Sequence, residues 1–574
     1  MVSKDDHFYY TQEMRYLSQE GVRFAEKHPD IARQLGLEDV KAELRDPHSE
    51  RILEGFAFLT GRIRKMLDRQ YPELAHALFN LVFPNYLRPV PSKTVCQFSS
   101  QEGMLDKPQV IPRGSEIRGK NKEIELIFST SHEVLLQPIE LKRLYVDPEV
   151  KADFSLSAEL KLHSGVDAGV LDYDAIEFFI HGDPGIRFEL FRQFSSELDS
   201  ICIKGLKVPD GQVTLDWIGF HPSRSFFEDE DETYLPLHVL RDYFDHPERY
   251  LFFKLNGLNE ALAPMLDDLT SFQIDFCFKR PFAAGSFFKA ENLLLHACSC
   301  QNAFRIAAEP MDINGEQLDY RLIPDIRQPE MEVLAVEKVL ISKDRVQHHV
   351  QPYYHFDRKT KQQEEHVFYA LRREPSEYGG WESFIRLFQL RQEGTLPLVG
   401  YTASTQILAC QGHLARSLKI GQLNELDRAL PETIQVRNVT QVSVPCWPPI
   451  YHQADWAFIA HLALNYKDIQ DVDALKELLG LYNFSQAETI NRKIDGILAL
   501  SRKRDYIVQT GRVVNGFTLV LTCDEDKFQH RGDVLMFGHV LSEFLKAFCP
   551  FNSFLRLQLE VGHQEQIFDR VVTG

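Results

Sequence analysis

The sequence predicts a multidomain α+β protein with amphipathic N-terminal helices, central β-sandwich or barrel-like modules and a C-terminal strand–helix–strand domain. Apolar residues recur at helical spacing near the N-terminus, short runs rich in Val, Ile, Leu and Phe follow, and the C-terminal part combines both patterns. At about 150 residues per domain, the chain length suggests roughly four domains. We expect a helical region over 1–90, β-rich modules over 91–345, a mixed or irregular region over 346–465 and an α/β domain over 466–574.

Two amphipathic helices are predicted before Gln70, because apolar side chains recur there at helical spacing. The second helix has a clear start, since Asp46 can cap it and Pro47 suits its first position. A third helix begins at Pro72 and ends at Pro84, and a proline-punctuated linker is expected over 86–92. The apolar faces of the first two helices need a partner surface, and they carry Tyr10, Met14, Leu17, Ile52, Phe56, Leu59 and Ile63.

Short apolar runs separated by Gly, Pro and Asp predict strands in the centre of the chain. Helices are expected between them around 188–198 and 237–244, and the polar stretch 343–380 is expected to be an irregular loop or boundary. The predicted strands are KTVCQFS (93–99), EIELIFST (123–130), EVLLQPIEL (133–141), AIEFFIHG (175–182), FQIDFCF (272–278) and MEVLAVEKVLIS (331–342).

The C-terminal pattern predicts helices and strands in alternation. A helix is expected over 471–481, and a capping box of Ser485 and Glu488 is expected to open a second helix that ends near Gly496. A strand over 516–523, a helix carrying apolar residues over 534–548 and a strand over 554–561 follow. Together these last three elements indicate a strand–helix–strand unit with one buried sheet face.

The composition excludes several classes of protein. The chain has 64 Lys and Arg against 83 Asp and Glu, a net charge of −19, which argues against binding to nucleic acid. No stretch of 18 apolar residues predicts a membrane span. Acidic residues occupy the start, where a signal peptide needs an apolar run, and the nine cysteines are thinly spread. These features predict a cytoplasmic protein with reduced thiols.

Two local motifs suggest ligand chemistry only weakly. Residues 114–121, GSEIRGKN, resemble a phosphate-binding loop, but Asn121 replaces the required Ser or Thr and a strand-like run follows. We expect a β-turn between strands there. The acidic run 228–232 lacks the alternate ligands and the glycine of a calcium loop, so a solvated loop is expected.

His296, Cys298 and Cys300 form the strongest metal-like pattern. Spacing of two places all three on one face of a strand, close enough to share zinc, which would fit a metal-dependent enzyme. The sequence has no CxxC pair to complete such a site, so a core strand with two buried thiols is expected instead. No GxSxG, HExxH or GxGxxG motif occurs, and we therefore expect no enzyme, no metal and no cofactor.

Several blocks, in order, resemble the TssF family, the baseplate subunit of the bacterial type VI secretion system. A departure lies at Ser404–Thr405–Gln406, where the family's Asn-Arg-Asp type block is expected in a loop. The blocks are HFYYTQEMRYLSQEGVRFAEKHPDIARQLGL, DPHSERILEGFAFLTGRI, YPELAHALFNLVFPNYLRPVPS, IGFHPSRSFFEDEDETYLPLHVLRDYFDHPERYLFF, AENLLLHACSCQNAFRIAAEPMDI and GFTLVLTCDEDKFQHRGDVLMFGHVLSEFLKAFCPFNSFLRLQ.

The resemblance implies a non-catalytic structural subunit. Two TssF copies and one TssG would form a wedge similar to that of contractile phage tails, joined by TssK and TssE and arranged around the VgrG hub. The subunit would lie in the cytoplasm at the inner membrane, reaching the membrane complex through TssK. The apolar helix residues named above would then contact TssG or the second TssF copy, or pack on the chain's own β-modules. Because such interfaces bury about 2,000 Å² or more, we expect the subunit to be poorly soluble alone.

Three other functions compete with this one. A wedge protein of another contractile injection machine shares most of these expectations. A metal-dependent hydrolase would use His296, Cys298 and Cys300. A free-standing carbohydrate-binding protein would require export.

Overall fold

The computed structural model describes most of the chain from Asn85 onward, and short stretches before it. The chain divides into two compact units, one of residues 1–84 with 449–457 and one of residues 85–448 with 458–574. The described residues are 10–11, 14, 54–61, 85–121, 124–146, 154–206, 208–209, 211–227, 235–282, 287–343, 346–353, 366–376, 379–391, 394–427, 429–448, 471–509, 512–549, 552–562 and 565–573.

In the smaller unit the described residues are helical. Residues 10–11, 14 and 54–61 all lie in helices, in agreement with the amphipathic pattern. Leu17, Ile52 and Ile63 lie outside the described residues, as does the helix expected after Pro72.

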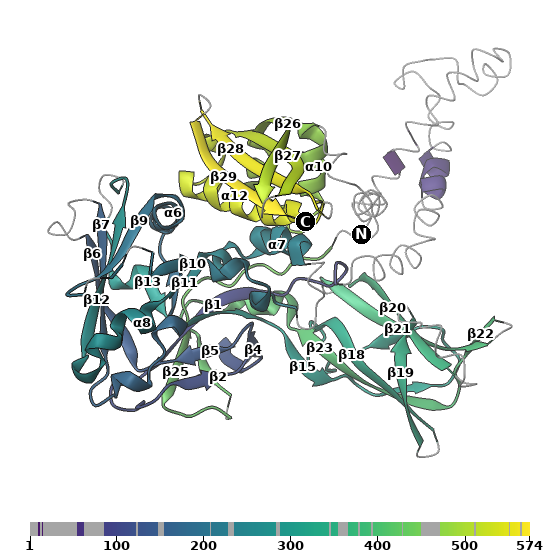
Figure 1. Ribbon diagram of the computed structural model, residues 1–574. Coiled ribbons are helices and arrows are strands. Elements are labelled where there is room, and N and C mark those ends of the chain that lie inside the picture. Colours follow the sequence, from purple (N-terminus) through teal and green to yellow (C-terminus); the bar gives the residue numbers. More distant parts are fainter. Residues whose placement is uncertain are drawn as a thin grey trace, which may run out of the picture. The chain divides into compact units, whose positions relative to one another are not determined.

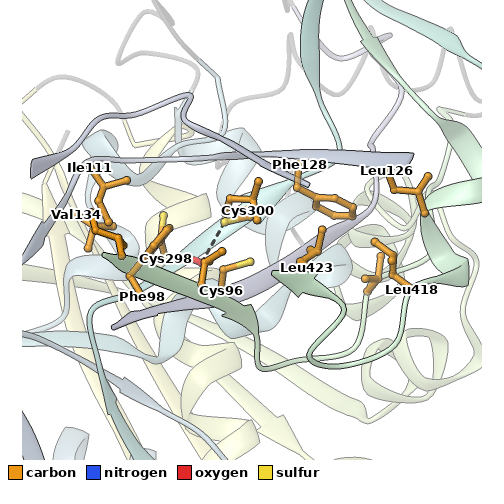
Figure 2. Packing of buried hydrophobic residues seen from close by; sticks show 14 of the residues in the cluster. Cys96, Phe98, Ile111, Leu126, Phe128, Val134, Cys298, Cys300, Leu418 and Leu423 are labelled. Carbon is orange, nitrogen blue, oxygen red and sulfur yellow. Dashed lines mark hydrogen bonds between the residues drawn. The ribbon is translucent and has the colours of Figure 1, made fainter. Parts of the chain in front are cut away.

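A six-stranded antiparallel sheet forms the centre of the larger unit (Figure 1). Its strand order is β24-β3-β4-β14-β1-β25, so it joins strands that are far apart in the sequence. The inward side chains of these strands form one apolar cluster with the small sheet of β2 and β5 (Figure 2). The strands are β1 (Lys93–Ser100), β2 (Gln109–Ile111), β3 (Glu116–Asn121), β4 (Ile124–Thr130), β5 (Val134–Leu136), β14 (Ala297–Gln301), β24 (Leu423–Leu426) and β25 (Ile434–Asn438).

Two four-stranded antiparallel sheets, with helices α6 (Pro184–Arg192) and α7 (Leu235–Asp245), complete the predicted β-rich part. The predicted helices near 188 and 237 are thereby confirmed. One sheet contains β10 (Thr214–Asp216), β11 (Phe252–Asn256), β8 (Glu177–Ile180) and β13 (Leu293–Leu295); the other contains β6 (Ile139–Val146), β7 (Ser155–Leu162), β12 (Ser271–Phe278) and β9 (Leu198–Ile203).

A nine-stranded sheet has its own apolar core. The expectation of an irregular stretch over 343–380 is wrong for its described parts, because β19 and β20 lie there; β19 exposes most of its side chains and so lacks an apolar pattern. The expected loop at Ser404–Gln406 is also wrong, since these residues lie in β23. The strands are β15 (Phe304–Ala307), β16 (Met311–Ile313), β17 (Tyr320–Leu322), β18 (Glu332–Lys343), β19 (Val346–Pro352), β20 (His366–Pro375), β21 (Trp381–Arg391), β22 (Gly394–Pro397) and β23 (Tyr401–Cys410).

The C-terminal part confirms the strand–helix–strand prediction. Strands β27 and β28 are parallel and are joined by α12, which packs on the sheet (Figure 1). Strands β26 and β29 flank them, each antiparallel to its neighbour. The elements are α10 (Val472–Gly480), α11 (Glu488–Asp495), β26 (Ile497–Gln509), β27 (Arg512–Cys523), α12 (Arg531–Lys546), β28 (Phe554–Val561) and β29 (Glu565–Thr573).

The capping box predicted at Ser485 is wrong. Helix α11 begins at Glu488 after Ala487, which makes no side-chain cap. The Ser485 hydroxyl instead accepts a hydrogen bond from the Ala487 amide at 3.3 Å, because Gln486 takes a positive φ of 47° between them. The helix ends before Gly496, as predicted.

The expected turn between strands lies at the start of 114–121, where the Ser115 amide donates a hydrogen bond to the Pro112 carbonyl at 3.3 Å and Gly114 has a φ of 79°. The residues from Glu116 to Asn121 form strand β3. One further expectation requires correction. The stretch 86–92 is buried and not a solvated linker: Val90 pairs with Cys446, and Tyr86 donates a hydrogen bond to the Leu481 carbonyl at 3.3 Å. Five of the six predicted central strands are present, whereas the one expected over 133–141 is divided into β5 and β6, which lie in different sheets. The fold is mixed α+β and rich in strands. No described helix is long and apolar enough to cross a membrane.

Candidate functional site

The helix over 54–61 presents apolar side chains to solvent. Phe56 and Leu59, two of the predicted contact residues, are 54% and 58% exposed, whereas Ala57 between them is fully buried. Tyr10, another predicted contact residue, is half-buried, as is Met14. Burial, and then the negative charge of Glu54, raise the pKa of Tyr10. The structure thus brings Tyr10 near Glu54.

His296 does not share a face with Cys298 and Cys300, contrary to the alternation argument. Strand β13 ends at Leu295, and β14 begins at Ala297 in a different sheet. His296 makes this change of sheet with a φ of 54°, which reverses the alternation expected of one continuous strand. Its Nε2 accepts a hydrogen bond from the Gln137 amide at 3.3 Å.

The two thiols belong to the central core. Cys298 and Cys300 lie with Cys96 among apolar side chains, and Cys300 donates a hydrogen bond to the Cys298 carbonyl at 3.5 Å (Figure 2). Burial raises the pKa of both thiols, so they are held protonated, whereas zinc binds thiolates. The ring beside Cys298 is that of His132, whose Nδ1 lies 3.6 Å from the sulfur. Within the described residues no group of three His, Cys, Asp or Glu side chains could hold a metal ion.

A buried ionic cluster joins the central sheet to α7. Lys93 of β1 lies 3.2 Å from Asp242 and 2.8 Å from Asp245, and Arg249 also pairs with Asp242. Burial alone would raise the pKa of Asp242, but Lys93 and Arg249 outweigh it and hold that pKa well below its ordinary value. Asp245 shares Lys93, and burial raises its pKa. The ring of Phe226 lies 4.3 Å from the Lys93 ammonium and covers it.

A second buried cluster joins α7 to the C-terminal part. Lys493 of α11 lies 2.7 Å from Asp533 of α12, and the Tyr243 hydroxyl of α7 donates to the same carboxylate at 3.0 Å. Next to Asp533, Gly532 allows α12 to lie close to α6, because an added Cβ there would lie 1.9 Å from the Phe188 carbonyl. Helix α12 therefore packs on both α6 and α7.

A third buried group, the Glu332 carboxyl, lies at the start of β18. It accepts hydrogen bonds from the Trp447 ring at 2.6 Å and from the Trp381 amide at 3.0 Å. Burial raises its pKa to about 7. The carboxyl connects the nine-stranded sheet to residues that follow the central sheet in sequence.

None of these charged residues was identified from the sequence. A signal was present for two of them: Lys93 opens an apolar strand, and Asp533 lies among the buried residues of a largely apolar helix. A charge at a core position predicts a buried partner but does not say which one.

These features define a class of protein, a multi-sheet α+β protein whose buried charges connect one module to the next. Comparison with known proteins supplies the family. The sequence model of the family described as "Type VI secretion system, TssF" matches residues 3–573. The chain belongs to the TssF family, a non-enzymatic family of structural type VI secretion components. The alternatives of a metal-dependent enzyme and of another contractile machine's wedge protein are thereby set aside.

Similar proteins include one curated relative and two solved structures. The chain is 28% identical over 615 residues to the type VI secretion system component TssF1 of Pseudomonas aeruginosa, covering 97% of each. It resembles a chain of the TssK–TssF–TssG baseplate subcomplex (TM-score 0.77, 22% identity), covering 91% of this chain and 99% of that one. It also resembles a chain of the baseplate complex from the type VI secretion system (TM-score 0.61, 21% identity), covering 98% of both. Because the sequence identities are only 22% and 21%, the two structures show that the fold is similar and nothing more.

Proposed function

We propose that the chain is a structural subunit of the type VI secretion baseplate wedge. Two copies would assemble with one TssG, be joined by TssK and TssE, and surround the VgrG hub at the cytoplasmic face of the inner membrane. Family membership supports the baseplate role, and the TssK–TssF–TssG subcomplex contains a chain of similar fold. The wedge would be similar to that of contractile phage tails.

The exposed helix over 54–61 is the observation that carries the proposed contact with TssG or the second copy. Phe56 and Leu59 are more than half exposed in the chain alone, and they lie in a unit that is compact by itself. Exposed apolar side chains that gather on one helix mark a surface for another protein. On this proposal, Tyr10, Met14, Leu17, Ile52 and Ile63 extend the same contact surface.

The larger unit would serve as the rigid part of the subunit, the platform on which the tail sheath and tube assemble. Its buried ionic clusters fix β1, α7, α11 and α12 relative to one another, because separating them would leave buried charges without partners. On this proposal residues 1–90 form the contact region, while 91–345, 346–465 and 466–574 form successive modules of the platform.

The test is a double variant, Phe56→Asp with Leu59→Asp, co-expressed with TssG. We expect co-purification with TssG to be lost while the circular dichroism of the isolated chain is unchanged, because both side chains already face solvent. The matched control is Ile420→Asp, which changes a side chain that is 56% exposed in the larger unit. If the double variant unfolds alone, or if it stays folded and still forms the complex of two copies with one TssG, the proposed contact is wrong.

A further inference from the structure

The hairpin of β26 and β27 extends beyond the sheet to which it belongs. The two strands pair from Ile497 and Cys523 as far as Gln509 and Arg512. Strand β28, however, pairs with β27 only from Gly516 onward. Residues 506–509 and 512–515 therefore form a two-stranded ribbon in the described part of the chain. A ribbon of two strands is marginally stable in water without a further surface to pack on.

The ribbon carries exposed apolar side chains on one face. Tyr506, Val508 and Val513 are 67%, 69% and 64% exposed. Val508 lies directly opposite Val513, and alternation places Tyr506 on the same side. Leu521 of β27 lies on this face too; its partner Leu559 packs against α12 at Gly538. The core face of the sheet thus continues past its covering helix as an uncovered apolar strip.

Strand β26 also offers a free edge. It is the outermost strand of its sheet (Figure 1), and among the described residues it pairs only with β27. The unpaired amides and carbonyls of an edge strand form a template on which another strand can add.

The charges next to the strip indicate what kind of strand fits. Arg502, Lys503 and Arg504 are consecutive in β26, although the chain as a whole has a net charge of −19. Lys503 and Arg504 are exposed and have no acidic partner among the described residues. Asp505, which follows them, is already paired with Arg556 at 3.1 Å. The edge is therefore locally basic, and within the described part of the chain the charges of Lys503 and Arg504 are not neutralised.

This charge pattern disfavours a second copy of the same strand. In a parallel pair in register each cation would face its own copy, and an antiparallel pair centred on Lys503 would also bring the two clusters together. Like charges opposite one another destabilise a strand pair. A strand with acidic side chains would instead be stabilised next to β26, because its carboxylates would lie opposite these cations.

We infer that the edge of β26 over 501–509 is a docking site for an extended acidic segment of another baseplate protein, which adds to the sheet as a strand. Its carboxylates pair with Lys503 and Arg504, and its apolar side chains at alternate positions cover Tyr506, Val508 and Val513. The site belongs to the larger unit, whereas the helices proposed to contact TssG belong to the smaller one. The inference rests on the proposed function only in assigning the acidic segment to another baseplate protein.

Amide hydrogen exchange tests this inference. The full chain is measured alone and in the assembly made by co-expression with TssG, TssK, TssE and VgrG. We expect the amides of 501–509 to exchange about ten-fold more slowly, or slower still, in the assembly. We expect Lys503→Glu with Arg504→Glu to abolish that protection, and Val571→Asp, on the opposite edge strand β29, to leave it intact.

Three results would overturn the inference. Equal exchange of 501–509 in both states would mean that no strand adds there. Protection in the chain alone that rises with its concentration would mean that a second copy binds. Protection that survives the charge reversal would mean that the partner is not acidic. A wild-type assembly that lacks TssG would count against the proposed function and not against this inference. The mass of the complex shows whether TssG is present.

Discussion

The ammonium of Lys93 lies 3.2 Å from the carboxylate of Asp242, and both side chains are almost completely buried. The two residues are 149 positions apart in the sequence. One opens a strand of the central sheet and the other lies in α7, which also packs on α12. This pair is therefore one of the points at which the modules of the larger unit are joined.

Replacing Lys93 by Met should destabilise the protein strongly. The substitution keeps the volume but leaves Asp242 and Asp245 buried with less positive charge nearby. We expect a loss of about 3 kcal/mol in the free energy of unfolding, because removing one partner of a buried pair leaves a buried charge uncompensated. Urea unfolding followed by circular dichroism measures this change. Adding Asp245→Asn to the variant should restore part of the loss.

Lys120→Met serves as the control for this substitution. Lys120 pairs with Glu425 at 3.1 Å, but their side chains are 58% and 51% exposed. We expect a change below about 1 kcal/mol, as for other surface pairs. A loss at Lys93 no greater than at Lys120 would show that the buried pair does not join the modules.

The Glu332 carboxyl should make stability depend on pH. Its pKa is raised to about 7 in the folded chain, so its protonated form stabilises the fold at low pH, and that contribution is lost as the pH rises through 7. Relative to Glu332→Gln, the wild type should lose up to about 3 kcal/mol between pH 5 and pH 8. Unfolding curves at several pH values measure the difference. Parallel pH profiles of the two proteins would argue against a titrating carboxyl at this position.

The thiols should differ sharply in reactivity. Cys202 is exposed and Cys549 is half-buried, whereas the other seven of the nine cysteines are buried. Burial raises the pKa of Cys298 and Cys300, which makes them poor nucleophiles. A thiol reagent should therefore modify Cys202 first in the native chain, and Cys202→Ser should remove that fast phase. Rapid native modification of Cys298 would contradict the described core.

Gly532→Ala should disturb the packing of α12. The added methyl group would lie 1.9 Å from the Phe188 carbonyl, so α6 and α12 must move apart. We expect a loss of about 2 kcal/mol or more, comparable to other overpacked cores. Gly480→Ala at the end of α10 is the matched control, because no atom lies within 4 Å of its added Cβ. Thermal unfolding of both variants decides whether the helix contact is as close as described.

Local patterns were sufficient to predict β27, α12 and β28 of the C-terminal part, whereas the two outer strands β26 and β29 were not predicted. Strand β28 alternates buried Leu555, Leu557 and Leu559 with polar residues, and α12 carries its apolar residues at helical spacing. Both signals arise from neighbours in the sequence that share one face, so they can be recognised without knowing the fold. The strand–helix–strand order then predicts their parallel pairing.

Long-range contacts could not be predicted in the same way. The proline-punctuated stretch 86–92 has the composition of a linker, yet it is buried, and Val90 pairs with Cys446, which is far away in the sequence. His296 has the spacing of a shared zinc site, but it turns the chain from one sheet into another. Lys93 and Asp242 are each a charged residue among apolar neighbours in the sequence, and only the tertiary fold shows that they pair with one another.

The most direct test of the structural role is the light-scattering mass of this chain co-purified with TssG from the same organism. The account predicts a stable complex that contains two copies of the 66.4 kDa chain for each TssG. A single 66.4 kDa species that elutes apart from TssG would contradict it.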